Sequence, residues 1–128
     1  MGHMVSPGEQ LVLAIYVRNL ETSLKFFLDF GFQLSRRDGP FVELRWEDSL
    51  LFLVERPDVT EPPTPVGNLR VMVPDVDAYY HKAQALGYTV VMPPGDRYYQ
   101  LRDFVIEGPD GIHLRFAGPV RQKNDLSA

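Results

Sequence analysis

The sequence predicts an α+β fold made of two copies of a strand–helix–three-strand (βαβββ) unit. A strand-like segment followed by an amphipathic helical segment occurs twice, at 11–31 and at 68–87, with a constant offset between the copies. Four prolines between the copies, within 56–67, indicate an extended linker. We therefore predict one domain at 5–118, with a first module at 10–55 and a second at 68–118.

The first module opens with LVLAIYV at 11–17, where β-branched and aromatic residues are typical of a strand. Asn19 is suited to cap the helix that follows, in which leucines and phenylalanines recur at helical spacing. Gly31 is expected to end this helix in the left-handed conformation. Three further strands are predicted at 32–37, 41–47 and 49–55, the last two joined by a tight turn at 47–49.

The second module repeats this order. NLRVMV at 68–73 predicts a strand, Asp75 a helix N-cap, and Gly87 the end of the helix. The remaining strands are predicted at 88–92, 101–107 and 112–117, with a turn at 108–111 before the last one.

The cap and the terminating glycine keep the same offset between the two modules. Asp75 follows Asn19 by 56 residues, and Gly87 follows Gly31 by 56 residues. A single βαβββ unit has its helix on one face of the sheet and leaves the other face open. Two such units can join their open faces around a concavity, where we expect the functional site.

Composition excludes several classes of protein. The 128 residues suit one domain, and a net charge of -4 gives no electrostatic footprint for nucleic acid. No apolar stretch is long enough to span a membrane. The absence of cysteine excludes disulfides, thiolate metal sites and a cysteine nucleophile. We expect a cytoplasmic protein, with an expression remnant at 1–4 and a polar tail at 119–128.

Several motifs resemble the vicinal oxygen chelate superfamily, which includes glyoxalases, dioxygenases and bleomycin-resistance proteins. The resemblance covers about 10–118 and rests on VRNLETSLKFF (17–27), VPDVD (73–77) and GPDG (108–111). It implies two βαβββ modules whose curved sheets surround a concave pocket.

The resemblance also places the metal ligands that enzymes of this superfamily use. They would be Val12, Phe52, Asn68 and Arg115. Valine and phenylalanine offer no donor atom, arginine repels a cation, and a lone asparagine cannot hold a transition metal. We therefore predict no metal and no cofactor, and a character closest to the metal-free bleomycin-resistance-type binding proteins.

Alternation along the strands predicts which side chains line the concavity. The first module contributes an apolar side, and the second a polar side with two arginines. Phe41, by resemblance, Trp46 and Phe52 would form an aromatic wall, although core or dimer contacts would equally explain them. A loop containing Tyr98 and Tyr99 would cover the pocket. The predicted ligand-binding residues are Tyr16, Phe41, Trp46, Phe52, Asn68, Arg70, Met72, Tyr98, His113 and Arg115. A strand with one solvated face would equally explain His113 and Arg115.

The resulting functional hypothesis is a homodimer that binds a small organic molecule, aromatic with a polar or anionic group, such as an antibiotic or a metabolite. We expect no nucleic-acid or membrane partner and no catalytic residue. One alternative is an enzyme of the superfamily, a lyase, isomerase or dioxygenase-like protein with a relocated or absent metal, in which His113 or Tyr16 carries a proton. The other is a structural or regulatory dimer without a small ligand.

Overall fold

The computed structural model describes residues 5–120, and the chain divides into two compact units between Glu61 and Pro62. This division falls within the predicted proline-rich linker, where 56–68 contain no helix or strand. The predicted remnant at 1–4 and most of the predicted tail, 121–128, lie outside the described residues.

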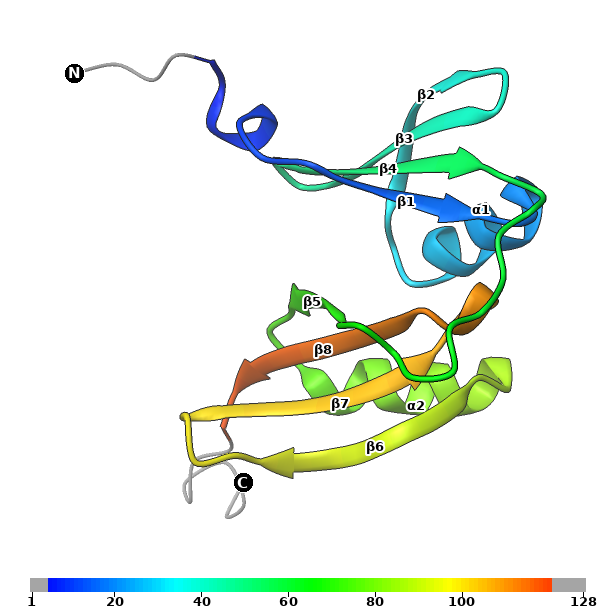
Figure 1. Ribbon diagram of the computed structural model, residues 1–128. Coiled ribbons are helices and arrows are strands. Elements are labelled where there is room, and N and C mark those ends of the chain that lie inside the picture. Colours follow the sequence, from blue (N-terminus) through cyan, green and yellow to red (C-terminus); the bar gives the residue numbers. More distant parts are fainter. Residues whose placement is uncertain (1–4, 121–128) are drawn as a thin grey trace. The chain divides into compact units, whose positions relative to one another are not determined.

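The first unit contains one helix and a four-stranded mixed sheet (Figure 1). The strands have the order β1-β4-β3-β2, in which β1 is parallel to β4 and the other pairs are antiparallel. After a 3₁₀ turn at Pro7–Glu9, the elements are β1 (Leu13–Val17), α1 (Leu20–Asp29), β2 (Gln33–Asp38), β3 (Phe41–Trp46) and β4 (Ser49–Glu55).

The second unit repeats this topology, with strand order β5-β8-β7-β6 and β5 parallel to β8. Its elements are β5 (Leu69–Met72), α2 (Val76–Leu86), β6 (Thr89–Asp96), β7 (Leu101–Glu107), a 3₁₀ turn at Pro109–Gly111, and β8 (His113–Pro119). The predicted α+β class with two βαβββ modules is therefore confirmed.

Both helices begin and end where their sequence signals predicted. The Asn19 side chain accepts a hydrogen bond from the Thr22 amide at 3.0 Å, and the Asp75 side chain accepts one from the Ala78 amide at 3.2 Å. Gly31 and Gly87 follow the helices with φ of 104° and 82°, a region that glycine reaches without steric cost.

Each helix packs on one face of its own sheet through an apolar core. In the first unit, Phe26, Phe27 and Phe30 are buried with Leu44 and Leu53. The second core contains Val76, Ala83, Phe104, Ile106, Leu114 and Phe116. We call the sheet face that its helix does not cover the open face of that module.

Strand β6 is longer than predicted. It continues past the predicted end at 92, through Pro93 and Pro94, to Asp96. Proline lacks the amide donor of a sheet ladder, but β6 is an edge strand and its register shifts between Met92 and Gly95. An edge position with a bulge tolerates proline, so the prolines do not end the strand.

Neither helix within residues 5–120 is long and apolar enough to cross a membrane.

Candidate functional site

Strand pairing places most of the predicted site residues on the two open faces. In the first module Ala14 pairs with Phe52 and Tyr16 with Val54, while the alternating Leu51 and Leu53 are buried on the helix side. In the second module Arg70 pairs with Arg115 and Met72 with Ala117, while Leu114 and Phe116 are buried.

The two registers show which positions of the modules are equivalent. Ala14–Phe52 in β1–β4 corresponds to Arg70–Arg115 in β5–β8, so Phe52 and Arg115 occupy the same position of their modules. Phe41 pairs with Val54 as Asp103 pairs with Ala117, so Phe41 and Asp103 are also equivalent.

These equivalent positions carry different chemistry. In the first module, the rings of Phe41 and Phe52 meet edge to face, with centroids 5.0 Å apart. In the second, Arg115 donates from Nε to Oδ2 of Asp103 at 2.8 Å. The same pair of positions thus forms an aromatic contact on one open face and, on the other, an ion pair in which only the carboxylate is fully buried.

Arginines lie over two rings of the first open face. The guanidinium of Arg56 lies 4.9 Å from the ring centroid of Tyr16, and that of Arg36 lies 5.2 Å from the centroid of Phe41. Tyr16 keeps 55% of its surface exposed. This face therefore combines aromatic surface with cations held beside it.

Trp46 does not join this aromatic surface. It shares the helix side of β3 with Val42 and Leu44, and its ring lies 5.1 Å from that of Phe32. The ring also covers Gly31, at the end of α1. Trp46 thus contributes to the core of the first module rather than to its open face.

Asp103 is the centre of a charged cluster on the second open face. Its side chain is 0% exposed and accepts hydrogen bonds from Arg97 Nε at 2.7 Å, Arg115 Nε at 2.8 Å and the Tyr99 hydroxyl at 2.5 Å. Arg115 also donates to the Tyr99 hydroxyl at 2.8 Å and lies 5.3 Å from the centroid of its ring. We call these four residues the Asp103 cluster.

The cluster shifts the ionisation of two of its members. Burial disfavours the Asp103 carboxylate, but hydrogen bonds from Tyr99, Arg97 and Arg115 outweigh burial and hold the pKa of Asp103 below its ordinary value. The hydrogen bond to Asp103 and then desolvation raise the pKa of Tyr99, against the lowering effect of Arg115. Asp103 is therefore a stable anion and Tyr99 a stable neutral phenol.

Local backbone structure brings Arg97 into the cluster. β6 and β7 are joined by a tight turn in which the amide of Gln100 donates to the carbonyl of Arg97 at 3.2 Å. A Cβ atom on Gly95 would lie 2.7 Å from Nη1 of Arg97, so the glycine leaves space for the guanidinium. Arg97 then also donates to the Pro93 carbonyl at 2.8 Å.

The remaining predicted residues of the second module lie on or beside β5, on β8 and in the β6–β7 turn. Arg70 and Met72 are exposed, and His113 is half-buried and pairs with Glu107 in the β7–β8 register. Asn68 lies just before β5 and is exposed. Tyr98 is in the predicted loop and is 93% exposed, in edge-to-face contact with Tyr99 at 5.0 Å.

Two members of the cluster, Arg97 and Asp103, were not among the residues that the sequence indicated, and Tyr99 was expected only in the covering loop. A signal for Asp103 was present, because an inward Arg115 needs a carboxylate and Asp103 lies in the neighbouring predicted strand at 101–107. Nothing in the local pattern indicated Arg97, since its position depends on the turn that follows an unexpectedly long β6.

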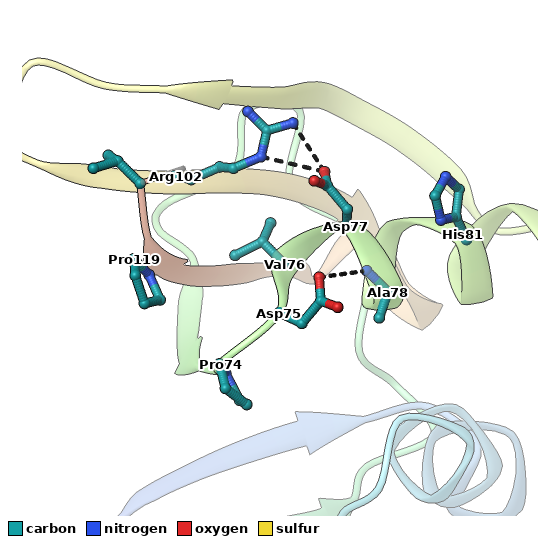
Figure 2. A pocket seen from close by; sticks show the side chains of 9 residues that line it. Pro74, Asp75, Val76, Asp77, Ala78, His81, Arg102 and Pro119 are labelled. Atoms are coloured by element: carbon teal, nitrogen blue, oxygen red, sulfur yellow. Dashed lines mark hydrogen bonds and ion pairs between the residues drawn. The ribbon is translucent and has the colours of Figure 1, made fainter. Parts of the chain in front are cut away.

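A separate pocket of about 600 Å³ lies at the start of α2 (Figure 2). Arg102 closes one wall by donating from Nη2 to Asp77 at 2.9 Å, and Asp75 is occupied as the helix cap. His81 is exposed on the rim. Because its charged groups satisfy one another or cap the helix, we place function on the open faces instead.

The donor atoms of the open faces do not fit a divalent metal. Phe52 is in ring contact, Arg115 is ion-paired, and Val12 and Asn68 precede their strands. Across residues 5–120 no group of three or more histidine, aspartate or glutamate side chains is placed to hold a metal ion.

Comparison with known proteins identifies the family. No curated protein matches the chain by sequence. Two solved structures described as glyoxalase/bleomycin resistance protein/dioxygenase are similar. One, from Nocardioides, has 22% identity and TM-score 0.72, covering 91% of this chain and 87% of the other. The second, from Burkholderia phytofirmans, has 21% identity and TM-score 0.75, covering 85% of this chain and 97% of the other.

A bleomycin-binding protein complexed with bleomycin is similar at 17% identity, with TM-score 0.71, over 88% of this chain and 99% of the other. These likenesses show the fold, which agrees with the family that the sequence motifs predicted. Residues 9–116 match the family model described as Glyoxalase/Bleomycin resistance protein/Dioxygenase superfamily, and the chain belongs to that superfamily.

Proposed function

We propose that this chain is a metal-free binding protein for a small organic molecule that has a flat, apolar body and an acidic group. The observation that carries the proposal is the contrast between equivalent positions of the two modules. Phe41 and Phe52 form an aromatic contact where Asp103 and Arg115 form an ion pair.

The open faces offer two kinds of surface, each within its own module. Tyr16, Phe41 and Phe52 offer ring surface on which a planar group stacks or meets edge to face. On the second face, Arg70, Arg97 and Arg115 outnumber Asp103 and Glu107, so positive charge is in excess. Excess positive charge on a partly desolvated surface favours an anionic group.

The donor set supports binding without a metal. The positions at which the superfamily's enzymes would hold a metal carry Val12, Phe52, Asn68 and Arg115. A related fold that is complexed with bleomycin supports a role in binding, and an antibiotic or a metabolite remains the proposed class of ligand.

Thermal unfolding in the presence of 2-naphthoate tests the proposal. This probe has a flat apolar body and one carboxylate. At one hundred times its dissociation constant it should stabilise the protein by about 2.7 kcal/mol. Carboxylates without a ring, such as acetate, should stabilise the protein far less at the same concentration and ionic strength.

A structural or regulatory dimer without a small ligand predicts no such stabilisation. Asp103 and Ala117 are fully buried on the second open face, so part of that face is filled by the protein's own side chains. If neither 2-naphthoate nor a wider set of aryl acids raises the unfolding temperature, the binding proposal fails and a structural or regulatory dimer is favoured.

A further inference from the structure

Two arginines of the second open face are neighbours in register but differ in their surroundings. Arg70 on β5 pairs with Arg115 on β8, and adjacent strands lie about 4.8 Å apart. Arg115 is bound to Asp103 and Tyr99. Arg70 is exposed, and with the residues that the structure describes it forms no hydrogen bond or ion pair.

Arg115 is poorly suited to receive an acid from outside. Its Nε and Nη2 atoms already contact Asp103 and Tyr99, and both edges that can hold a carboxylate by two parallel bonds use Nη2. Turning that edge toward a ligand would leave the fully buried Asp103 with less compensation. Arg97 is similarly occupied by Asp103 and the Pro93 carbonyl.

We propose that Arg70 binds the acidic group of the ligand. In this proposal the Asp103 cluster does not bind the acid itself but holds the cations of Arg97 and Arg115 in place near Arg70. This inference rests on the proposed function and assigns its acid-binding residue. The guanidinium of Arg70, which has no partner among residues 5–120, offers a planar fork for a carboxylate. The neighbouring Arg115 adds positive potential while it stays bonded to Asp103.

Met72 completes the site on the same strand. It lies two residues after Arg70, so it shares the open face, and 48% of its surface is exposed. Its flexible thioether gives apolar contact beside the anchored acid. The combination favours an aryl or branched carboxylate over a small inorganic anion.

A matched pair of probes tests the assignment. 2-Naphthoate and 2-naphthamide share one ring system and differ in the charge of the group that Arg70 would hold. Their affinities are measured by calorimetric titration for the wild type, for Arg70→Met and for Lys82→Met. Lys82 is an exposed cation of α2, on the helix side of the same module, and serves as the charge-matched control.

Arg70→Met should weaken 2-naphthoate binding about tenfold or more, the effect of losing a hydrogen-bonded charge pair. It should leave 2-naphthamide binding and the unfolding temperature nearly unchanged. Lys82→Met should change neither affinity. Arg115→Met should lower the unfolding temperature. Protein that remains folded should lose less 2-naphthoate affinity than Arg70→Met does, because it keeps the Arg70 fork and loses only the positive potential of Arg115.

Each of the remaining outcomes contradicts one part of the proposal. If Arg70→Met binds both probes as the wild type does, the acid is anchored elsewhere. If it loses both probes equally, Arg70 acts in packing and does not recognise the charge. If Arg115→Met abolishes 2-naphthoate binding with no loss of stability, the division of roles is wrong. If the wild type binds neither these probes nor any of the wider set of aryl acids, the proposed function itself fails, and this inference with it.

Discussion

At the scale of single residues, Asp103 decides the character of the second open face. It is fully buried, yet two arginines and a tyrosine direct their donors to it. Removing its charge leaves Arg97 and Arg115 without their carboxylate. We expect Asp103→Asn to lower the free energy of unfolding by about 3–5 kcal/mol, the range for breaking a buried pair. Urea unfolding at pH 7 measures the loss.

The pKa of Asp103 predicts how stability depends on pH. Because the folded protein lowers that pKa, the contribution of Asp103 is fully present above the unfolded value of about 3.9 and is lost as pH falls through the lower folded value. Wild-type stability should therefore decline below about pH 4 more steeply than that of Asp103→Asn. Parallel acid titrations followed by circular dichroism would contradict this if the two curves kept a constant separation.

Two glycines of the second module predict a contrast between backbone and side-chain crowding. A Cβ on Gly118 would lie 2.2 Å from the Val73 carbonyl oxygen, whereas a Cβ on Gly95 would meet only the movable end of Arg97. Gly118→Ala should cost about 1–3 kcal/mol, in the range of overpacking, and Gly95→Ala clearly less. Equal losses of unfolding free energy in the two variants would show that Arg97 is as rigid as the backbone.

At the scale of elements, the two helices begin with different capping arrangements. In α1, Asn19 accepts from Thr22 and Glu55, at the end of β4, accepts from the Leu20 amide at 2.9 Å. In α2, Asp75 accepts from Ala78. The first helix is thus tied to its own sheet through a strand side chain, as well as capped locally.

This difference predicts distinct effects of cap removal. Asn19→Ala and Asp75→Ala should each cost about 1 kcal/mol, the usual value for losing an N-cap. Glu55→Gln keeps an acceptor and should cost less than Asn19→Ala. Chemical denaturation of the three variants gives the ranking, and a larger loss for Glu55→Gln would mean that its charge, rather than its hydrogen bond, stabilises α1.

At the scale of the whole molecule, we propose a two-fold dimer. Both sheets have edge strands at β1, β2, β5 and β6, and unpaired edges favour association unless they are covered. Leu11 and Leu13 near the β1 edge are 91% and 55% exposed, which adds apolar surface there. Closed two-fold symmetry is the commonest way to cover such surfaces.

Size-exclusion chromatography with light scattering, at micromolar protein concentration, tests whether the chain forms this dimer. We expect about twice the chain mass of 14.6 kDa. Leu11→Lys with Leu13→Lys should shift the population toward the monomer, because charged edges resist pairing. A monomer in the wild type would refute the dimer without affecting the binding proposal, whose site residues are assigned within single modules.

Much of the architecture followed from the sequence because its signals are local. An N-cap contacts an amide three residues away, and a terminating glycine is required by its own φ, so Asn19, Asp75, Gly31 and Gly87 were recognisable along the chain. Strand alternation likewise placed Phe52 and Arg115 on open faces. The same alternation separates Phe41 from Trp46, which have opposite parity in β3, and Trp46 packs on the helix side.

Only the tertiary structure decided how the open faces work. Whether Pro93 and Pro94 end a strand depends on β6 being an edge, which is a property of the sheet order. The Asp103 cluster combines a turn after β6 with side chains of β7 and β8, so no local pattern contains it. Buried charges are stable only when partners from several strands converge, and that convergence left Arg115 occupied and Arg70 available.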